Sequence, residues 1–400
     1  MGLDRTVEPI EVGFAPERLD RLDRHFDAYV DDGRLAGYLL SVSRHGQVAH
    51  LHGYGFADRE AGRAVDGHTV FRLHSMTKVV TSVALLTLYE RGLLQLTDPV
   101  AKFLPAFADS RVYVDADTTR PAAGPIRVWQ LLAHTSGLSY PMFDAHPVDA
   151  MYRAAGLGST SEGSSLAEVV DLYGSMPLMF DPGTSWAYSV AHLILGRLIE
   201  VVSGQEFDAF LAEQVFGPLD MRDTGFTLAA DQAHRAAAMY GPGPDGKAVP
   251  IPSPSLTERP SVLSGSGGLV SSAADFHRFL GLLRQRGEHD GVRLLAPRTV
   301  DLLTANHLPG GADLAAFSSW GAEEFSGIGF GFGVQVTLDP VRRKLAGSAG
   351  EFGFGGASST AFFVDPVADL TVQFLTQLRP VGTYPLHSEL KQLVYQALVT

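Results

Sequence analysis

The segment LHSMTKVVTSVALLTLYERG spans residues 73–92 and joins a Ser-x-x-Lys motif to a strongly apolar run. Its apolar character and the glycine at its end, Gly92, predict a helix over Ser75–Arg91. Side chains three positions apart lie on the same face of a helix. The segment therefore predicts that Lys78 lies one turn beyond Ser75 and close to its hydroxyl.

A lysine in apolar surroundings beside a serine indicates nucleophilic chemistry. A serine hydroxyl is a weak nucleophile until a neighbouring base removes its proton. Lysine can act as that base when burial lowers its pKa, and Leu73, Val79 and Val80 surround Lys78 with apolar side chains. The start of the helix adds partial positive charge, which favours the alkoxide and the oxyanion that follows it. These residues predict Ser75 as the nucleophile and Lys78 as its base.

The same spacing occurs a second time in the chain, at Ser388 and Lys391. That copy falls in a predicted terminal helix, where we expect the serine to cap and the lysine to face solvent. On the motif alone, Ser75 would likewise be a capping serine followed by a lysine that faces solvent. The apolar residues that flank Lys78 argue against a solvated lysine there.

Outward from this segment, strands are predicted near both ends of the chain and helices in the middle. Pro16–Val30 has helical periodicity, and Tyr38–Arg44 with Gln47–Tyr54 predicts a hairpin. Long loops, such as Asp115–Pro125 and Gly156–Ser165, are expected in the middle. The predicted elements after residue 261 are helices at Ala273–Arg284 and Pro297–Ala305, strands at Phe330–Leu338, Ser358–Val364 and Leu370–Leu375, and a terminal helix after Gly382.

This order of elements predicts two structural regions. Residues 1–95 and 261–400 would form one α/β domain, and residues 96–260 would form a mainly helical insertion. The length of 400 residues is ample for both. Binding sites favour such junctions, so we expect the active site between the two regions.

Composition narrows the classes of function. The chain has no cysteine, which excludes disulfides, thiolate catalysis and zinc–thiolate sites. Its net charge of −13 repels nucleic acid and anionic lipid surfaces. The sequence contains neither an uninterrupted apolar run of about eighteen residues nor a signal-like start. We therefore expect a cytoplasmic enzyme with no nucleic-acid or membrane partner.

A second candidate group is the tyrosine of Trp186-Ala187-Tyr188-Ser189-Val190. It precedes a predicted helix over Ser189–Val202, so its phenol could project into the cleft between the two regions. A nearby ammonium would depress the pKa of such a phenol and let it shuttle protons. The alternative is a buried aromatic ring whose hydroxyl is satisfied by hydrogen bonds.

A third candidate is the glycine-rich stretch GEFGFGGASST, residues 350–360. Glycines beside a strand allow close approach of a ligand to the backbone. An exposed edge strand there could donate a backbone N–H to a substrate oxyanion. A bulge or a tight turn is the alternative interpretation.

These three elements, in this order, resemble the penicillin-recognising serine hydrolases. The greatest likeness is to the class C β-lactamase-like branch that includes the family VIII carboxylesterases, and it extends from about residue 16 to 395. Further segments that resemble this branch are LLAHTSGL at 131–138, PLDMRDT at 218–224 and GGLVSSAAD at 267–275. The resemblance implies an α+β, β-lactamase-like fold: an α/β domain with an antiparallel sheet flanked by helices, plus an all-helical domain.

The resemblance also implies roles for particular residues. Ser75 would be acylated, Lys78 would be its base, and Tyr188 would be the second proton-transfer residue. The backbone N–H groups of Ser75 and Ala357 would form the oxyanion hole. No metal ion and no organic cofactor are implied.

Two departures from the class C pattern favour esters over β-lactams. Val190 stands where those lactamases carry an asparagine that binds the lactam side chain. The triplet Phe354-Gly355-Gly356 replaces their lysine-threonine-glycine, so the cation that helps to hold the β-lactam carboxylate is missing. Esterases of the branch usually have tryptophan and two glycines there, and phenylalanine is a mild aromatic variant of that pattern.

The loops at residues 139–165 and 240–260 are expected to determine the choice of substrate. Tyr140, Met142, Phe143 and Tyr240 in these loops suggest an apolar acyl or alcohol pocket. The sequence predicts a serine carboxylesterase acting on short-chain or small carboxylic esters. Hydrolysis of β-lactams or of D-amino-acid amides and peptides, and acyl transfer, are the alternatives within the same fold.

Other classes of function are less well supported. The chain lacks the Gly-x-Ser-x-Gly elbow that a typical Ser-His-Asp hydrolase carries. His134, at the end of a predicted helix, is expected to satisfy loop carbonyls. A metal hydrolase is disfavoured because His-Glu-x-x-His is missing and because His50 and His52 are expected to face solvent. A catalytically inactive binding protein is disfavoured by the intact candidate residues. The expected partner is a small-molecule ester, and the oligomeric state stays open.

Overall fold

The computed structural model describes residues 2–158, 163–317 and 322–400. Within these residues the largest sheet has eight strands, in the order β12-β13-β14-β15-β16-β1-β2-β3. All neighbouring strands pair antiparallel. The strand bounds are β1 Gly37–Arg44, β2 Gln47–Asp58, β3 Arg63–Ala64, β12 Ile328–Phe330, β13 Gln335–Thr337, β14 Phe352–Gly355, β15 Ala361–Asp365 and β16 Leu370–Leu375. The two ends of the chain thus build one antiparallel sheet, which confirms the predicted fold class.

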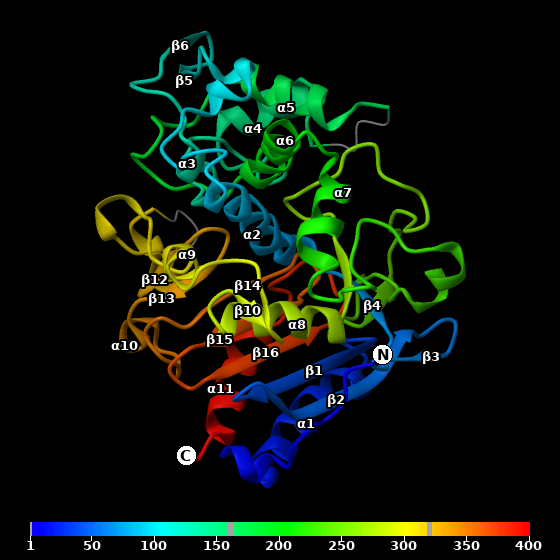
Figure 1. Ribbon diagram of the computed structural model, residues 1–400. Coiled ribbons are helices and arrows are strands. Elements are labelled where there is room, and N and C mark those ends of the chain that lie inside the picture. Colours follow the sequence, from blue (N-terminus) through cyan, green and yellow to red (C-terminus); the bar gives the residue numbers. More distant parts are fainter. Residues whose placement is uncertain (1, 159–162, 318–321) are drawn as a thin grey trace.

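Helices cover both faces of this sheet (Figure 1). α1 (Pro16–Asp31) and α11 (Leu386–Ala397) pack together on one face, and α8 (Ala273–Arg284) packs on the other. Successive side chains of a strand point to opposite faces. In β1, Leu40 accordingly joins the core formed with α1 and α11, whereas Leu39 joins the core that contains α8. This double cover explains why β15 and β16 are buried along their whole length.

The remaining elements are mostly helices and short strand pairs. The other helices are α2 Thr77–Glu90, α3 Val128–Leu132, α4 Pro147–Ala154, α5 Leu166–Ser175, α6 Ala191–Ser203, α7 Phe207–Leu211, α9 Pro297–Leu303 and α10 Pro340–Arg343. The strand pairs are β4 Val70–Arg72 with β9 Val270–Ser272, β5 Arg111–Asp115 with β6 Thr118–Pro121, β7 Tyr240–Pro242 with β8 Ala248–Pro250, and β10 Glu288–His289 with β11 Val292–Arg293.

The helix α2 lies in Figure 1 between the sheet and the group of helices α3 to α6. Its residues from Thr77 to Leu88 are all buried, as expected for a helix that is apolar on every side. A 3₁₀ turn over His74–Met76 precedes it, so Ser75 lies in that turn rather than in the α-helix. The predicted end is confirmed at Gly92, whose φ of 71° is left-handed. The predicted division of the chain at residues 95 and 260 stays a prediction.

Two predicted segments differ in the structure. Asp115–Pro125, expected to be a loop, contains β6, which pairs with β5 in a hairpin. Phe330–Leu338, expected to be one strand, contains a turn in which the Gly331 N–H donates to the Val334 carbonyl, so it is divided between β12 and β13. In the first place the polar, Pro- and Gly-containing composition concealed a short strand, and in the second the apolar pattern concealed a reversal of the backbone. The loop expected at 156–165 lies partly outside the described residues.

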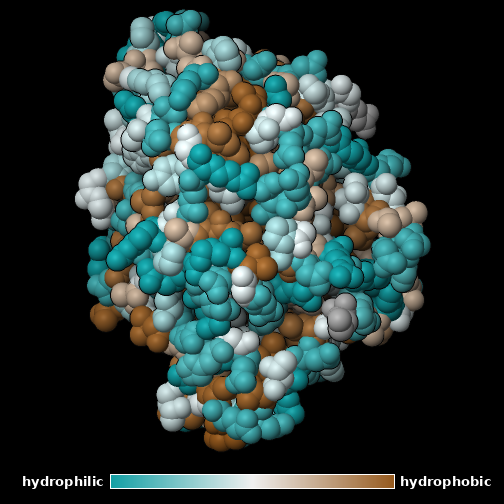
Figure 2. Space-filling view, viewed as in Figure 1, coloured by the Kyte–Doolittle hydropathy of each residue, from teal (hydrophilic) through white to brown (hydrophobic). Residues whose placement is uncertain are grey.

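The surface in Figure 2 is mostly hydrophilic, with smaller apolar areas interspersed. Large apolar side chains that are well exposed, such as those of Ile10, Val341 and Val367, come from separate parts of the chain. Single exposed apolar residues are normal on folded proteins. Within the described residues, no helix combines the length and apolarity that crossing a bilayer requires.

Candidate active site

The structure brings Ser75, Lys78 and Tyr188 into direct contact. The Tyr188 phenol donates a hydrogen bond of 2.6 Å to Ser75 Oγ, and Lys78 Nζ lies 3.3 Å from the same oxygen. Lys78 Nζ also donates to the carbonyl of Ser266 at 2.7 Å. One serine oxygen thus faces an amine and a phenol together, an arrangement suited to general-base activation of a nucleophile.

Three segments that are far apart in the chain build this cluster. The pairing of β4 with β9 brings the Ser75 turn beside residues 264–272, which supply the Ser266 carbonyl. Small residues allow this approach: a Cβ on Gly265 would lie 2.5 Å from the carbonyl oxygen of His192, and one on Gly268 would lie 2.7 Å from the Phe226 ring. The glycines around Ser266 are therefore needed for packing against α6 and its neighbours.

Burial sets the protonation state of the lysine. The Lys78 side chain is 0% exposed, and burial lowers its pKa from 10.5 to about 7. Among the described residues, no carboxylate forms an ion pair with Lys78; its hydrogen-bond partners are a hydroxyl and a carbonyl. Low-dielectric surroundings without a counter-ion favour the neutral amine. A substantial fraction of Lys78 is therefore able to accept a proton at neutral pH.

The tyrosine behaves differently from the expectation. Burial, followed by the charge of the Tyr140 phenol, raises the pKa of Tyr188. The expected depression by a nearby ammonium is wrong, although Lys78 Nζ lies 4.6 Å from the centroid of the Tyr188 ring. Because burial favours the neutral amine as well as the neutral phenol, neither group supplies the charge that would ionise the other. Tyr188 is thus a protonated donor toward Ser75.

Aromatic rings enclose Tyr188. Tyr140 stacks on it at 5.8 Å, Phe143 lies at 6.0 Å and Phe354 at 5.9 Å between ring centroids. Phe330 meets the other side of Phe354 edge-on at 5.9 Å. The predicted pocket residues Tyr140 and Phe354 are therefore next to the serine cluster. Their contact with a substrate stays a prediction.

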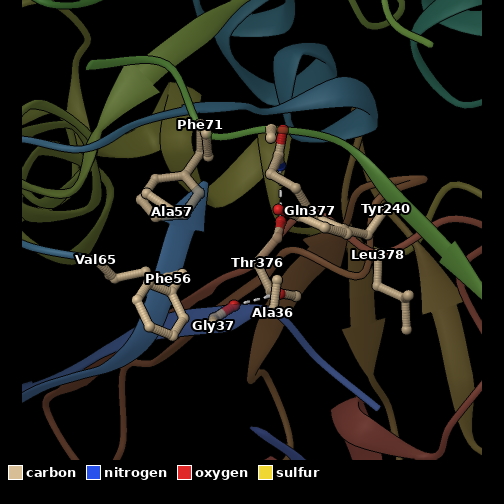
Figure 3. Close-up of a pocket in the computed structure, with 12 residues that line it drawn as sticks. Ala36, Gly37, Phe56, Ala57, Val65, Phe71, Tyr240, Thr376, Gln377 and Leu378 are labelled. Atoms are coloured by element: carbon tan, nitrogen blue, oxygen red, sulfur yellow. Dashed lines mark hydrogen bonds between the residues drawn. The ribbon is translucent and has the colours of Figure 1, made fainter. Parts of the chain in front are cut away.

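The prediction for Tyr240 is wrong. Its phenol donates to Glu60 at 2.5 Å and accepts the backbone N–H of Arg59 at 2.8 Å. Figure 3 shows the separate pocket that Tyr240 lines together with Phe56 and Phe71. The hairpin of β7 and β8 turns this side chain toward β2 because the backbone of Tyr240 pairs with residues 377–379.

The glycine-rich stretch approaches the Ser75 turn closely. A Cβ on Gly356 would lie 2.5 Å from the carbonyl oxygen of Leu73, and one on Gly355 would lie 2.5 Å from the ring of His387. β14 is an internal strand rather than the expected edge, but its last two residues, Phe354 and Gly355, extend beyond its pairing with β13. The oxyanion-hole role of the backbone N–H groups of Ser75 and Ala357 stays a prediction.

Val190 precedes α6 and is 4% exposed, with its side chain in the core that contains α2. Its N–H donates to the Ser139 carbonyl at 3.2 Å, so it links the loop of Tyr140 to the start of α6. Its predicted contact with substrate stays a prediction.

His134 contacts the residues on both sides of Tyr188. Its carbonyl accepts the N–H of Ala187 at 3.0 Å, and its Nδ1 accepts the N–H of Ser189 at 3.3 Å. The Ser189 hydroxyl lies 2.9 Å from the same nitrogen. The expectation that this ring satisfies loop carbonyls is wrong, and its place beside Tyr188 was not predicted from the sequence. The sequence feature that could have drawn attention to His134 is the resemblance of residues 131–138 to a segment of the family.

The second Ser-x-x-Lys motif has a different environment. Ser388 Oγ donates to the Pro385 carbonyl at 2.9 Å and makes no helix-capping hydrogen bond, so the expectation that this serine caps is wrong. The Lys391 side chain is only 12% exposed and forms an ion pair with Glu351, whose side chain is 1% exposed. The expectation that Lys391 faces solvent is therefore wrong. The lysine lies between α11 and the sheet, where the carboxylate of Glu351 balances its charge.

The histidines of β2 also differ from their prediction. His50 Nε2 lies 2.7 Å from Asp23, and His52 Nε2 lies 2.9 Å from Asp27. Both rings are partly buried against α1, so they do not simply face solvent. Among the described residues, no group of three or more His, Cys, Asp or Glu side chains is placed to hold a metal ion.

A two-sided antiparallel sheet with a serine and a buried lysine at the start of the central helix is the architecture of the β-lactamase-like serine hydrolases. The beta-lactamase family model matches residues 22–395, and the chain belongs to this family. It is accordingly an enzyme of the serine hydrolase class.

Known relatives cover nearly the whole chain. Esterase EstB of Burkholderia gladioli is 33% identical over 94% of each chain. Lovastatin esterase of Penicillium rubens is 29% identical over 86% of this chain and 89% of its own. The structure of EstCE1, described as a hydrolase with promiscuous acyltransferase activity, superposes with a TM-score of 0.81 at 26% identity, covering 95% of this chain and 98% of its own.

Proposed function

We propose that this enzyme is a carboxylesterase that hydrolyses short-chain or small carboxylic esters through an acyl-Ser75 intermediate. The observation that carries the proposal is the position of Ser75 Oγ between the Lys78 amine and the Tyr188 phenol. The similarity to EstB, which is named an esterase, supports esters as the substrate class. No metal or organic cofactor is required by these residues.

Acylation begins with the ester carbonyl beside Ser75. Neutral Lys78 removes the hydroxyl proton as Oγ attacks the carbonyl carbon, and the Tyr188 phenol stabilises the developing alkoxide through its hydrogen bond. The backbone N–H groups of Ser75 and Ala357 hold the oxyanion of the tetrahedral intermediate. As the intermediate collapses, Tyr188 protonates the leaving alkoxide and regains a proton from Lys78.

Deacylation uses the same two groups in the same roles. Water takes the place of the departed alcohol and attacks the acyl carbon while Lys78, helped by Tyr188, accepts its proton. Ser75 then leaves, its oxygen reprotonated through the phenol, and the carboxylic acid is released. The buried position of Lys78 keeps its pKa near 7, so one residue can accept and return the proton in both half-reactions.

Esters are favoured over β-lactams by the residues around the cluster. Phe354, Gly355 and Gly356 stand where a lactamase has a lysine-threonine-glycine triplet, and they bring no cation. Val190 brings no amide for a lactam side chain. Aromatic rings beside Tyr188 instead offer apolar contacts to the acyl or alcohol group of an ester.

Acyl transfer to an alcohol or amine is the second candidate function. The observation that favours it is the similarity to EstCE1, a hydrolase with promiscuous acyltransferase activity. Both reactions share the acyl-Ser75 intermediate and differ in whether water or another acceptor attacks it. Adding an acceptor alcohol during ester turnover, with quantification of the ester and acid products, separates the two.

The decisive experiment compares p-nitrophenyl acetate and butyrate with a chromogenic cephalosporin, using wild type and Ser75→Ala. We expect rapid ester turnover that vanishes in the variant, and little cephalosporin cleavage by either protein. A preference for the cephalosporin would make the enzyme a β-lactamase. Ester turnover that survives in Ser75→Ala would remove Ser75 as the nucleophile.

A further inference from the structure

Tyr188 must hold its phenol within 2.6 Å of Ser75 Oγ, yet it lies in a segment without regular structure just before α6. A displacement of about 1 Å from a productive geometry can lower a rate by about 100-fold. The backbone around Tyr188 therefore needs anchors, and these anchors belong to a residue outside the proposed catalytic group.

His134 supplies the anchors on both sides of the tyrosine. Its carbonyl accepts the N–H of Ala187, one residue before Tyr188, and its Nδ1 accepts the N–H of Ser189, one residue after it. The Ser189 hydroxyl approaches the same Nδ1 at 2.9 Å. One histidine thus holds both neighbours of Tyr188, with its backbone on one side and its ring on the other.

The ring of His134 also supports the ring of Tyr188. The two centroids are 4.9 Å apart, and Phe330 closes the opposite edge of the imidazole at 5.3 Å. The His134 side chain is 0% exposed, and its φ of 57° is in the left-handed region, which is uncommon for residues other than glycine but is adopted more often by asparagine, aspartate and histidine. In this backbone conformation, the carbonyl and the ring of His134 both contact the segment from Ala187 to Ser189.

The hydrogen bonds require a neutral ring. The Ser189 N–H points at Nδ1, which assigns the ring proton to Nε2, a buried nitrogen with no hydrogen-bond partner among the described residues. Burial, followed by the charge of Lys78, lowers the pKa of His134 well below its usual value. Among the described residues, the other polar groups packed against this ring are His192, whose ring is 5.0 Å away, and Ser189, Tyr188 and Trp186; burial lowers the pKa of His192 as well. His134 therefore keeps its Nδ1 lone pair over the working range of pH.

We propose that His134 is the positioning residue of Tyr188, holding Ala187 and Ser189 so that the phenol stays in reach of Ser75. It does not touch Ser75, so it acts on the reaction through Tyr188. The inference rests on the proposed role of Tyr188 in proton transfer, and it adds a residue whose removal disturbs that role and leaves substrate binding nearly unchanged.

Two substitutions separate the acceptor from the ring. His134→Asn retains an acceptor at the position of Nδ1 and suits a left-handed backbone. His134→Phe retains a ring but leaves the Ser189 N–H and hydroxyl without this partner. We expect His134→Phe to lower kcat by about 100-fold with KM changed less than about 2-fold, and His134→Asn to lower kcat by less than about 10-fold.

A double-mutant cycle distinguishes positioning from a general structural role. In a Tyr188→Phe background the phenol is already gone, so His134→Phe should cause less than about 3-fold further loss. An equal loss in both backgrounds would overturn the proposal, as would equal losses for His134→Asn and His134→Phe. Ser189→Ala, which removes the hydroxyl contact to His134 and a longer one to the Ala191 N–H, keeps the Ser189 N–H; it is expected to lie between wild type and His134→Phe and provides a test if the latter does not fold.

The same variants are also compared by the rate at which a p-nitrophenyl phosphonate modifies Ser75. This reaction needs an activated Ser75 but no particular natural ester. The wild type should release p-nitrophenol in one stoichiometric burst. If the burst rate then falls in the order wild type, His134→Asn, His134→Phe, the inference stands even where ester turnover fails. A wild-type protein that neither turns over esters nor reacts with the phosphonate refutes the proposed function itself.

Discussion

The chain contains two Ser-x-x-Lys motifs in two environments. At Ser75 the lysine lies beside the serine, and its amine contacts the hydroxyl and a carbonyl. At Ser388 the hydroxyl donates to the Pro385 carbonyl within the first turn of α11, and Lys391 instead forms an ion pair with Glu351, which also accepts from Arg343 and from Tyr395. Both motifs present serine and lysine at the same spacing, so the spacing alone does not distinguish them.

What separates the two lysines is the charge beside them. Burial lowers the pKa of Lys78 to about 7 and that of Lys391 to about 8. The carboxylate of Glu351 opposes the shift at Lys391 and stabilises its charged form. Lys78 has no such carboxylate among the described residues. The comparison supports the proposed catalytic role of the motif at Ser75, where the lysine is buried without a counter-ion among the described residues and the serine faces the amine.

The largest expected effect tests the two serines. Ser75→Ala should lower ester turnover by a factor of about 10⁴ or more, because it removes the atom that becomes acylated. Ser388→Ala is the matched control and should keep wild-type turnover, since its hydroxyl contacts only a backbone carbonyl. Initial rates with p-nitrophenyl butyrate measure both. A large loss in Ser388→Ala would end the distinction between the motifs.

The two lysines should separate activity from stability. Lys78→Met removes the proposed base and should lower kcat by about 10³-fold while the protein stays folded. Lys391→Met should keep activity but lower the free energy of unfolding by about 3 kcal/mol, because it leaves the buried Glu351 with less compensation. Kinetics and urea unfolding, measured on both variants, should show lost activity with kept stability for Lys78→Met and kept activity with lost stability for Lys391→Met. Equal loss of activity in both would contradict it.

The two phenols provide a smaller contrast. Tyr188→Phe should lower kcat by about 100-fold, since proton transfer to the leaving group is lost and the ring packing is kept. Tyr395→Phe removes a phenol that bonds Glu351 and Asp365, and it should leave kcat close to wild type. Steady-state kinetics on one ester tests the pair. A Tyr188→Phe enzyme with full activity would remove Tyr188 from the mechanism.

The pH dependence should follow Lys78. Its amine is protonated below a pKa of about 7 and cannot then accept the serine proton, so kcat/KM should fall about tenfold per pH unit on the acid side. Because burial raises the pKa of Tyr188, the phenol should cause no loss of rate up to about pH 9. Glu351→Gln removes the negative charge beside Lys391 and Arg343 but does not touch the surroundings of Lys78, so it should leave the midpoint in place. A shifted midpoint of the pH profile in that variant would show that the ionisation of Lys78 depends on the surroundings of Lys391.

The smallest expected effect concerns β14, which begins next to Glu351 and ends beside the Ser75 turn. Phe354→Trp enlarges a half-buried ring that contacts Tyr188 and should change kcat/KM by less than about 3-fold for small esters. A panel of acyl chain lengths measures the change. A loss of more than about 30-fold for all esters would show that Phe354 does more than line the pocket.

Much of the fold was predictable because it depends on local spacing. α8 begins and ends at the predicted residues, and α1, the first hairpin and β16 lie where periodicity placed them. Ser75 and Lys78 share a turn for the same reason. The hairpin of β5 and β6 and the division between β12 and β13 were not predicted. Short polar or glycine-containing turns reverse the backbone there, and the periodicity of apolar residues does not reveal such turns.

The sequence by itself determined the helix that carries Lys78, with Ser75 in the turn before it, the antiparallel sheet built from both ends of the chain, and the family. Only the tertiary structure decided which lysine has a counter-ion, that Tyr188 stays protonated, and that His134 holds it. The physical reason is that burial and charge pairing depend on residues far apart in sequence. Glu351 precedes Lys391 by 40 positions, and Tyr188 follows Ser75 by 113.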